Sequence, residues 1–300
     1  MINENPIISL FGPAVHPEFW MRFYNSLSSN EIPFEVIFVG NKPPSFQLPG
    51  NCHFIYTEVK PVQCVEIGAR YAVGDLIMPF ADDIVLSEHA LDNLYREFKE
   101  LNDDRIILSC RYVWEGKDMT GTGRYWSDNQ NSPIMPVGGL MNRKLWQQLG
   151  GIDKHFVGLF WDLDIAMRVY EIGGRVVLSK NVYLEEFRTP NIFSKNPLIV
   201  KKFLRMFPGI RKKIIEWIVF PLEKKKTLFL EFGVFTDRPT LERFWVMKNE
   251  PPGGVSPNSI YCIDKREDRG ILSKKRLALV EPFEDKHILT VSQGPKGRWK

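Results

Sequence analysis

The chain has 300 residues, of which 44% are hydrophobic, and its 40 Lys and Arg nearly balance its 36 Asp and Glu. This apolar content excludes a disordered chain, and a net charge of +4 gives no strong nucleic-acid signal. The four cysteines, Cys52, Cys64, Cys110 and Cys262, are widely spaced, which predicts neither a disulfide framework nor a structural zinc site. No apolar run approaches the roughly 20 residues of a membrane span, and no secretory leader is evident, so we expect a cytoplasmic protein.

The first part of the chain alternates short apolar runs with helical patterns. Buried strands are predicted for five apolar runs, at residues 7–11, 34–39, 53–56, 75–80 and 106–110. Helices are predicted between them, at residues 17–27, 62–72 and 89–101. Ser87 is expected to cap the last of these helices. Such alternation predicts an α/β fold, with a mostly parallel mixed sheet, helices on both faces and ligands bound beyond the carboxyl ends of the strands.

The second part of the chain is less regular. Residues 111–136 are rich in Gly, Asn, Ser and Asp, and an irregular segment of this length is commonly functional. Helices are predicted at residues 140–149 and 162–172, and strands at residues 175–178 and 182–184. The composition changes near Thr189 and Pro190, which divides the chain into a first domain, residues 1–190, and a basic, partly helical C-terminal extension, residues 191–300.

The basic clusters of the extension suggest a surface function. Residues 196–229 mix Lys and Arg with Leu, Ile, Phe and Trp. Amphipathic segments of this kind can lie on an anionic bilayer, which would make the protein peripheral at the inner face of a membrane. Ordinary solvated helices are the alternative interpretation.

Two groups of acidic residues are the candidates for chemistry. Asp82 and Asp83 directly follow the strand at 75–80, where adjacent carboxylates repel one another unless they bind a hard divalent cation. A helix cap or a solvated turn is the alternative. Asp162 and Asp164 lie in the first turn of the helix predicted at residues 162–172, where unpaired backbone N–H groups favour carboxylates. Because residues two apart do not share a helix face, we predict Asp162 as a general base and Asp164 as structural.

The order of these motifs resembles the family 2 glycosyltransferases, which have the GT-A (Rossmann-like) fold. The acidic pair is followed by Val-Gly-Gly-Leu-Met-Asn-Arg at 137–143, by Leu-Gly-Gly-Ile-Asp at 149–153, and by Trp-Asp-Leu-Asp-Ile-Ala-Met-Arg at 161–168. The resemblance covers about residues 5–190. It implies metal-assisted, inverting transfer of a hexosyl group from a UDP- or GDP-linked donor to a glycan or lipid-linked acceptor, as in surface polysaccharide synthesis.

The resemblance implies roles for individual residues. Asp83 looks like the last acid of the family's DxD motif, which binds Mn²⁺ or Mg²⁺ at the donor diphosphate, with Asp82 beside it at the ribose or the metal. Asp162 looks like the base that removes the acceptor hydroxyl proton. The predicted donor contacts are Phe11, Gly12, Asn41, Arg70, Asp82, Gly138 and Gly139. The predicted acceptor contacts are Trp114, Trp161 and Asp162.

The chain departs from the family pattern at several positions. Ala81 stands at the first acid of the DxD motif, and Asn41 stands in a segment without the acids that often grip the base. Trp161 replaces the acid that often precedes the catalytic base. Glu185 and Glu186 follow the last strand, where family members often have a metal-binding histidine. These departures leave two alternatives open, a nucleotidyltransferase on a similar sheet and a catalytically inactive module that binds a sugar nucleotide.

Overall fold

The computed structural model describes residues 5–59, 61–114, 116–118, 136–154, 161–187, 277 and 280–284. The strands are β1 (Ile8–Pro13), β2 (Phe34–Gly40), β3 (Cys52–Tyr56), β4 (Leu76–Pro79), β5 (Ile84–Leu86), β6 (Ile106–Trp114), β7 (Lys117–Asp118), β8 (Leu140–Asn142) and β9 (Arg175–Glu186). The helices are α1 (Pro17–Ser26), α2 (Pro61–Tyr71), α3 (Ala90–Leu101), α4 (Arg143–Gln148) and α5 (Trp161–Glu171).

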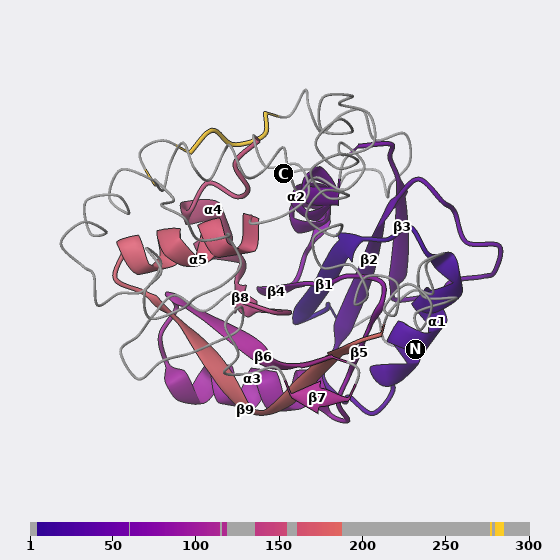
Figure 1. Cartoon of the computed structure of the whole chain (residues 1–300), viewed down its shortest axis with the longest axis horizontal. Coiled ribbons are helices and arrows are strands. Elements are labelled where there is room, and N and C mark those ends of the chain that lie inside the picture. The colour runs from indigo at the N-terminus through magenta and orange to yellow at the C-terminus, as the bar shows by residue number, and fades with distance from the viewer. Residues whose placement is uncertain are drawn as a thin grey trace, which may run out of the picture.

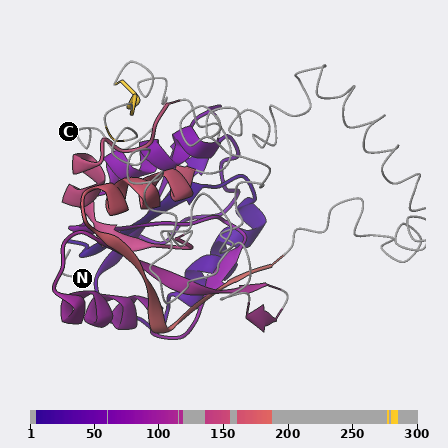
Figure 2. The same cartoon turned by 60° about the vertical axis from the view of Figure 1, so that its left-hand side comes forward.

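The described strands form one mixed sheet between two layers of helices. Its order is β3-β2-β1-β4-β8-β6-β9-β5, with β7 paired to β6 outside that path. Figures 1 and 2 show α2, α4 and α5 together on one face and α3 on the other. The predicted α/β sheet with helices on both faces is therefore confirmed.

The parallel half of the sheet creates the crevice in which a ligand would bind. β1 pairs in parallel with β2 and β4, and β2 pairs in parallel with β3. These strands are covered on both faces, which is why they read as unbroken apolar runs such as residues 36–39, all fully buried. The chain leaves β1 toward β2 and later returns to β4 on the other side of β1. This reversal opens a crevice beyond the carboxyl ends of β1 and β4.

The other half of the sheet adds antiparallel strands. β8 pairs antiparallel with β4 and β6, β5 pairs antiparallel with β9, and β6 and β9 run parallel. The strands predicted at residues 175–178 and 182–184 are one strand, whose pairing with β6 shifts register between Ser109 and Arg111. Sequence periodicity did not reveal β5 and β8, because three residues are too few to show a period.

The helix predicted over residues 140–149 is wrong at its start. Leu140 and Met141 pair with β6 and are buried, so they belong to the sheet. Asn142 ends the strand, and its side chain accepts a hydrogen bond from the backbone N–H of Lys144 at 2.9 Å. This Asn cap starts α4 three residues later than predicted.

A short segment near the C-terminus packs against the first domain. The backbone N–H of Lys154 donates to the carbonyl of Glu281 at 2.8 Å, and the N–H of Glu281 donates to the Asp153 carboxylate at 3.2 Å. The side chain of Phe283 is buried. Part of the predicted C-terminal extension therefore contributes to the packing of residues 1–190.

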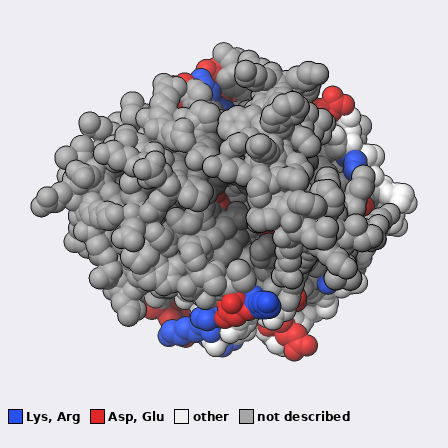
Figure 3. Space-filling model, in the orientation of Figure 1, with Lys and Arg blue, Asp and Glu red and all other residues white. Residues whose placement is uncertain are grey.

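The membrane-contact prediction for residues 196–229 lies outside the described residues. In the part of the chain that the structure describes, no helix has the length and apolar composition required to cross a bilayer. Along the lower edge of Figure 3, Lys and Arg side chains of described residues lie beside Asp and Glu side chains. This mixture agrees with the small net charge of the chain.

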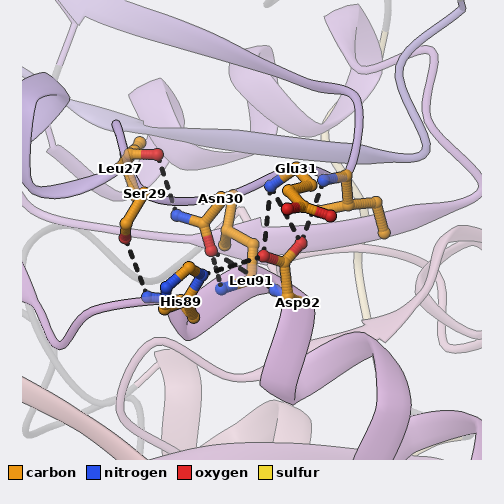
Figure 4. A network of polar contacts seen from close by, with 8 residues as sticks. Leu27, Ser29, Asn30, Glu31, His89, Leu91 and Asp92 are labelled. Atoms are coloured by element: carbon orange, nitrogen blue, oxygen red, sulfur yellow. Dashed lines mark hydrogen bonds and ion pairs between the residues drawn. The ribbon is translucent and has the colours of Figure 1, made fainter.

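The N-terminus of α3 is capped by a residue that is distant in sequence. The side-chain oxygen of Asn30 accepts hydrogen bonds from the backbone N–H groups of Leu91 at 2.7 Å and Asp92 at 3.3 Å. Asp92 in turn accepts from the N–H of Glu31 at 3.1 Å (Figure 4). The prediction that Ser87 caps this helix is wrong, because the Ser87 hydroxyl accepts a hydrogen bond from a backbone N–H of β9.

Replacement of Asn30 by alanine tests this cap. Because two N–H groups of α3 lose their acceptor, we expect Asn30→Ala to lower the free energy of unfolding by about 1 kcal/mol, measured by urea denaturation. Ser28→Ala is the control, since this exposed hydroxyl donates to the Asn25 carbonyl within its own turn. Equal losses in the two variants would contradict the capping role.

Candidate functional site

An aromatic cluster supports the corner that follows β4. Trp20 of α1 stacks on Phe38 with ring centroids 4.4 Å apart, and Phe23 stacks on Phe80 at 4.3 Å. Phe80 directly follows β4, and its backbone N–H donates to the carbonyl of Phe11 at 2.9 Å. The acidic residues that come next are therefore held on a buried, well-packed base.

Asp82 binds the start of α1. Its carboxylate accepts hydrogen bonds from the backbone N–H of His16 at 2.6 Å and from the indole N–H of Trp20 at 3.3 Å. The His16 imidazole lies 3.3 Å from its other oxygen, and Asp82 is only 5% exposed. A negative charge at a helix N-terminus is stabilising. Both oxygens of Asp82 thus contact α1, and its predicted roles at the metal and the donor remain predictions.

Asp83 faces a different environment, in which its charge is unfavourable. Burial, and next the nearby carboxylates of Glu186 and Asp82, raise the pKa of Asp83 to about 6. A backbone hydrogen bond links the residue before β5 to the residue after β9, since the carbonyl of Asp83 accepts from the N–H of Phe187 at 3.0 Å. The hydroxyl of Tyr112 donates to the Glu186 carboxylate. Asp83 and Glu186 thus form a pair of mutually repelling carboxylates at the sheet edge.

This pair fits a divalent cation that arrives with a phosphate ligand. Among the described residues, no group of three or more His, Cys, Asp and Glu side chains could hold a metal ion by itself. Mg²⁺ and similar ions are commonly bound by one or two carboxylates together with substrate phosphate oxygens. Asp83 and Glu186 supply carboxylates of that kind, so the cation site would be completed by a diphosphate.

A pocket of about 260 Å³ opens beside the acidic pair. Four residues predicted from the sequence line it, namely Gly138, Gly139, Trp161 and Asp162. Ala81 and Glu186 line it as well, whereas Asp83 is not among its lining residues. The structure therefore brings the predicted base and the turn that was predicted to contact the sugar together in one cavity next to the acidic corner.

The first turn of α5 divides its two acids between two tasks. Asp162 lines the pocket, whereas Asp164 is fully buried and pairs with Arg168 at 2.9 Å. Arg168 also donates to the carbonyl of Gly151 at 2.8 Å, which ties α5 to the loop after α4. The structural role predicted for Asp164 agrees with these contacts, and Asp162 stays the predicted base.

Two of the predicted donor-binding glycines are required by close packing. Gly138 has a φ of +54°, and a Cβ there would lie 2.7 Å from Leu184 and 2.9 Å from Met78. A Cβ at Gly12 would lie 1.8 Å from the carbonyl oxygen of Phe80. Gly12 thus allows β1 to approach the corner after β4, and Gly138 allows the pocket-lining turn.

Two other predicted donor contacts are engaged elsewhere. Phe11 is fully buried and packs edge-on against Trp146, with ring centroids 6.0 Å apart. Arg70 binds the buried Glu66 at 2.9 Å and donates to the carbonyl of Phe283. Arg70 lines a second pocket, separate in its lining residues from that of Asp162. In the structure Phe11 is a core residue and Arg70 contacts the C-terminal segment, and their predicted donor roles remain predictions.

Asn41 and Trp114 lie at the ends of two strands of the sheet. Asn41 directly follows β2 and is exposed. Trp114 ends β6, where its backbone is in register with Glu186 of β9. Their predicted donor and acceptor roles remain predictions.

Sequence reasoning missed two groups that shape the acidic corner. Tyr112 lies within a strand and shows no local signal of its contact with Glu186. His16 looked isolated in the sequence, yet it lies against Asp82. Both contacts join residues more than sixty positions apart, so only the fold could reveal them.

Comparison with known proteins identifies the fold. No family model and no curated protein matches the sequence. The crystal structure of S. aureus TarS 1–349 aligns with a TM-score of 0.50 and 14% identity, over 60% of this chain and 60% of that chain. That structure in complex with UDP-GlcNAc gives 0.47 and 13%, over 61% and 59%. GalNAc-T7 with UDP, GalNAc and Mn²⁺ gives 0.49 and 14%, over 62% and 45%.

The alignment covers less than two thirds of each of these solved chains. At such identities the likeness concerns the fold. With the observed strand order and helix layers, it defines this chain as an α/β protein with a GT-A-like fold.

The raised pKa of Asp83 predicts a stability cost in the metal-free protein. Because the pKa of Asp83 in the folded protein, about 6, exceeds the ordinary aspartate value of 3.8, the favourable protonated state of the folded protein is lost as the pH rises through 6. At pH 7.5 in EDTA we expect Asp83→Asn to stabilise the protein by about 1 to 3 kcal/mol, measured by thermal denaturation. Below pH 4 this gain should disappear.

Asp103→Asn is the control of opposite sign. A backbone hydrogen bond from Arg105 holds the pKa of Asp103 below its ordinary value, so its removal should not stabilise the protein. Lower stability of Asp83→Asn at pH 7.5 would contradict the unfavourable burial of Asp83.

Proposed function

We propose that the chain is an inverting family 2 glycosyltransferase that uses a nucleoside diphosphate sugar and a divalent cation, Mn²⁺ or Mg²⁺. The observation that carries this proposal is the placement of Asp162 and Glu186 on one pocket, with the backbone of Asp83 hydrogen-bonded to the residue after Glu186. The pocket lies beyond the carboxyl ends of β1 and β4, where ligands of such sheets bind. The GT-A-like fold is consistent with this chemistry.

In the proposed reaction, Asp162 accepts the proton of the acceptor hydroxyl. The hydroxyl oxygen forms a bond to the anomeric carbon of the donor while the bond from that carbon to the diphosphate breaks. The nucleoside diphosphate leaves with the electron pair, and the configuration at the anomeric carbon inverts. Asp83 and Glu186 would hold the cation, which neutralises the charge on the leaving diphosphate. Positioning of the acceptor hydroxyl against Asp162 lowers the remaining part of the activation barrier.

Trp161 is the residue of the pocket that suits an acceptor sugar. Trp161 lines the pocket beside Asp162, and an aromatic ring there offers a stacking surface for a sugar. We propose a glycan or lipid-linked acceptor, with residues 196–229 as the segment that would bring the protein to the inner face of a membrane. TarS has been crystallised with UDP and with UDP-GlcNAc, which makes uridine nucleotides the first donors to test.

The metal site predicts a coupled binding effect. We expect Mn²⁺ and UDP together to raise the thermal denaturation temperature more than either alone, and Asp83→Asn or Glu186→Gln to abolish the additional rise, because a carboxylate ligand is lost. Glu185→Gln is the matched control, since neighbouring residues of a strand point to opposite faces. Undiminished protection in both ligand variants would refute this site.

The catalytic role of Asp162 predicts a separation of binding from turnover. We expect Asp162→Asn to lower kcat by about 10²-fold to 10⁴-fold, because the amide cannot accept the proton, while donor affinity stays within a few-fold. Asp75→Asn, at an exposed position before β4, is the control. Full activity of Asp162→Asn would place the base elsewhere. Release of pyrophosphate instead of nucleoside diphosphate would favour a nucleotidyltransferase.

A further inference from the structure

Among the described residues, six aliphatic side chains form the most buried part of the pocket lining, which we call the inner wall. It is formed by Val65, Ile84, Ile107, Met141, Ile165 and Leu184, none of which is more than 3% exposed. These six side chains come from six different elements, namely α2, β5, β6, β8, α5 and β9. The fold therefore converges on an apolar cavity at the point where the proposed function places the transferred sugar.

The polar side chains of the described pocket residues are few, and most are less buried than the inner wall. Asp162, Trp161 and Glu186 are partly buried, in contrast to the inner wall. The hydroxyl of Tyr112 lies deeper, but it donates its hydrogen bond to Glu186. A sugar hydroxyl directed at the inner wall would thus lose its hydrogen bonds to water and meet aliphatic side chains in return.

The apolar wall disfavours a hydroxyl group and favours a methyl group, and this difference distinguishes between classes of sugar. An unpartnered buried hydroxyl is unfavourable, whereas a methyl group gains from the same contact. The hydroxymethyl group of a hexose is the substituent that becomes a methyl when it loses its oxygen. An N-acetyl group also ends in a methyl, but its amide would require hydrogen-bond partners that the six wall residues lack.

We propose that the donor is a nucleoside diphosphate 6-deoxyhexose, whose methyl group packs against this inner wall. The proposal rests on the proposed function, since it assigns the pocket to the transferred sugar. The pocket volume of about 260 Å³ is slightly below the common range of roughly 300–1,000 Å³ for ligand sites, which suits one sugar and not a whole nucleotide.

Matched donor pairs test the proposal on the full chain. GDP-mannose is compared with its 6-deoxy counterpart, and UDP-galactose and UDP-glucose with theirs, so that each pair shares base and ring stereochemistry. The dissociation constants are measured by calorimetry with Mn²⁺ and without acceptor. For at least one pair, we expect the 6-deoxy donor to bind about 10-fold to 100-fold more tightly, the range that one hydroxyl produces in an apolar pocket.

The outcomes separate this proposal from the proposed function. If UDP or GDP binds with Mn²⁺ but every hydroxylated donor binds as tightly as its 6-deoxy counterpart, the sugar assignment is overturned and the proposed function stands. A larger preference for UDP-GlcNAc over UDP-glucose than for any 6-deoxy donor over its parent would also overturn it. If neither nucleoside diphosphate nor any donor binds, both proposals fail.

A pair of variants at Ile107 tests the wall itself. Threonine and valine have nearly the same shape, so Ile107→Thr and Ile107→Val differ chiefly by a hydroxyl at the pocket wall. We expect Ile107→Thr to reduce the preference for the 6-deoxy donor at least three-fold relative to Ile107→Val. Equal preferences in two variants that both bind the nucleoside diphosphate would show that this wall does not contact the position-6 group.

Discussion

The geometry of the site depends on the contact between the Asp82 carboxylate and the start of α1. This contact joins the end of β4 to a helix that began more than sixty residues earlier, and it places a negative charge where the helix N-terminus is positive. With Asp82 engaged by His16 and Trp20, Asp83 is the acid of the pair that remains near Glu186. Two adjacent residues of the same type thus acquire different tasks from their neighbours alone.

The same division appears in the first turn of α5. Asp164 is held in the interior by Arg168, whose guanidinium also binds the loop after α4, while Asp162 lines the pocket. At each corner a buried carboxylate with hydrogen-bond or ion-pair partners fixes the backbone. A second carboxylate, Asp83 or Asp162, lies nearby, and the pKa of Asp83 is raised to about 6. Perturbed pKa values of this kind are commonly found at functional sites.

The sequence predicted the regular elements well because they carry their own signals. Apolar runs identified β1, β2 and β4, and the spacing of Asp162 and Asp164 separated their environments. Features that depend on distant residues could not be predicted. The Asn30 cap of α3, the Tyr112 contact with Glu186 and the strands β5 and β8 all arise from pairing across the fold. The apolar inner wall is also of this kind, since each element contributes one side chain to it.

The pairing of β5 with β9 brings a second carboxylate to the acidic corner that follows β4. Ile84, next to Asp83, is in antiparallel register with Glu186, so a carboxylate from β9 lies beside the corner that follows β4. A carboxylate supplied from another strand can face Asp83 with a cation between them, which adjacent residues of one turn do less readily. Ala81 meanwhile lines the pocket with a single methyl group, leaving room at its rim. Under the proposed function, the second carboxylate that would hold the cation comes from β9, while Ala81 contributes only a methyl group to the pocket.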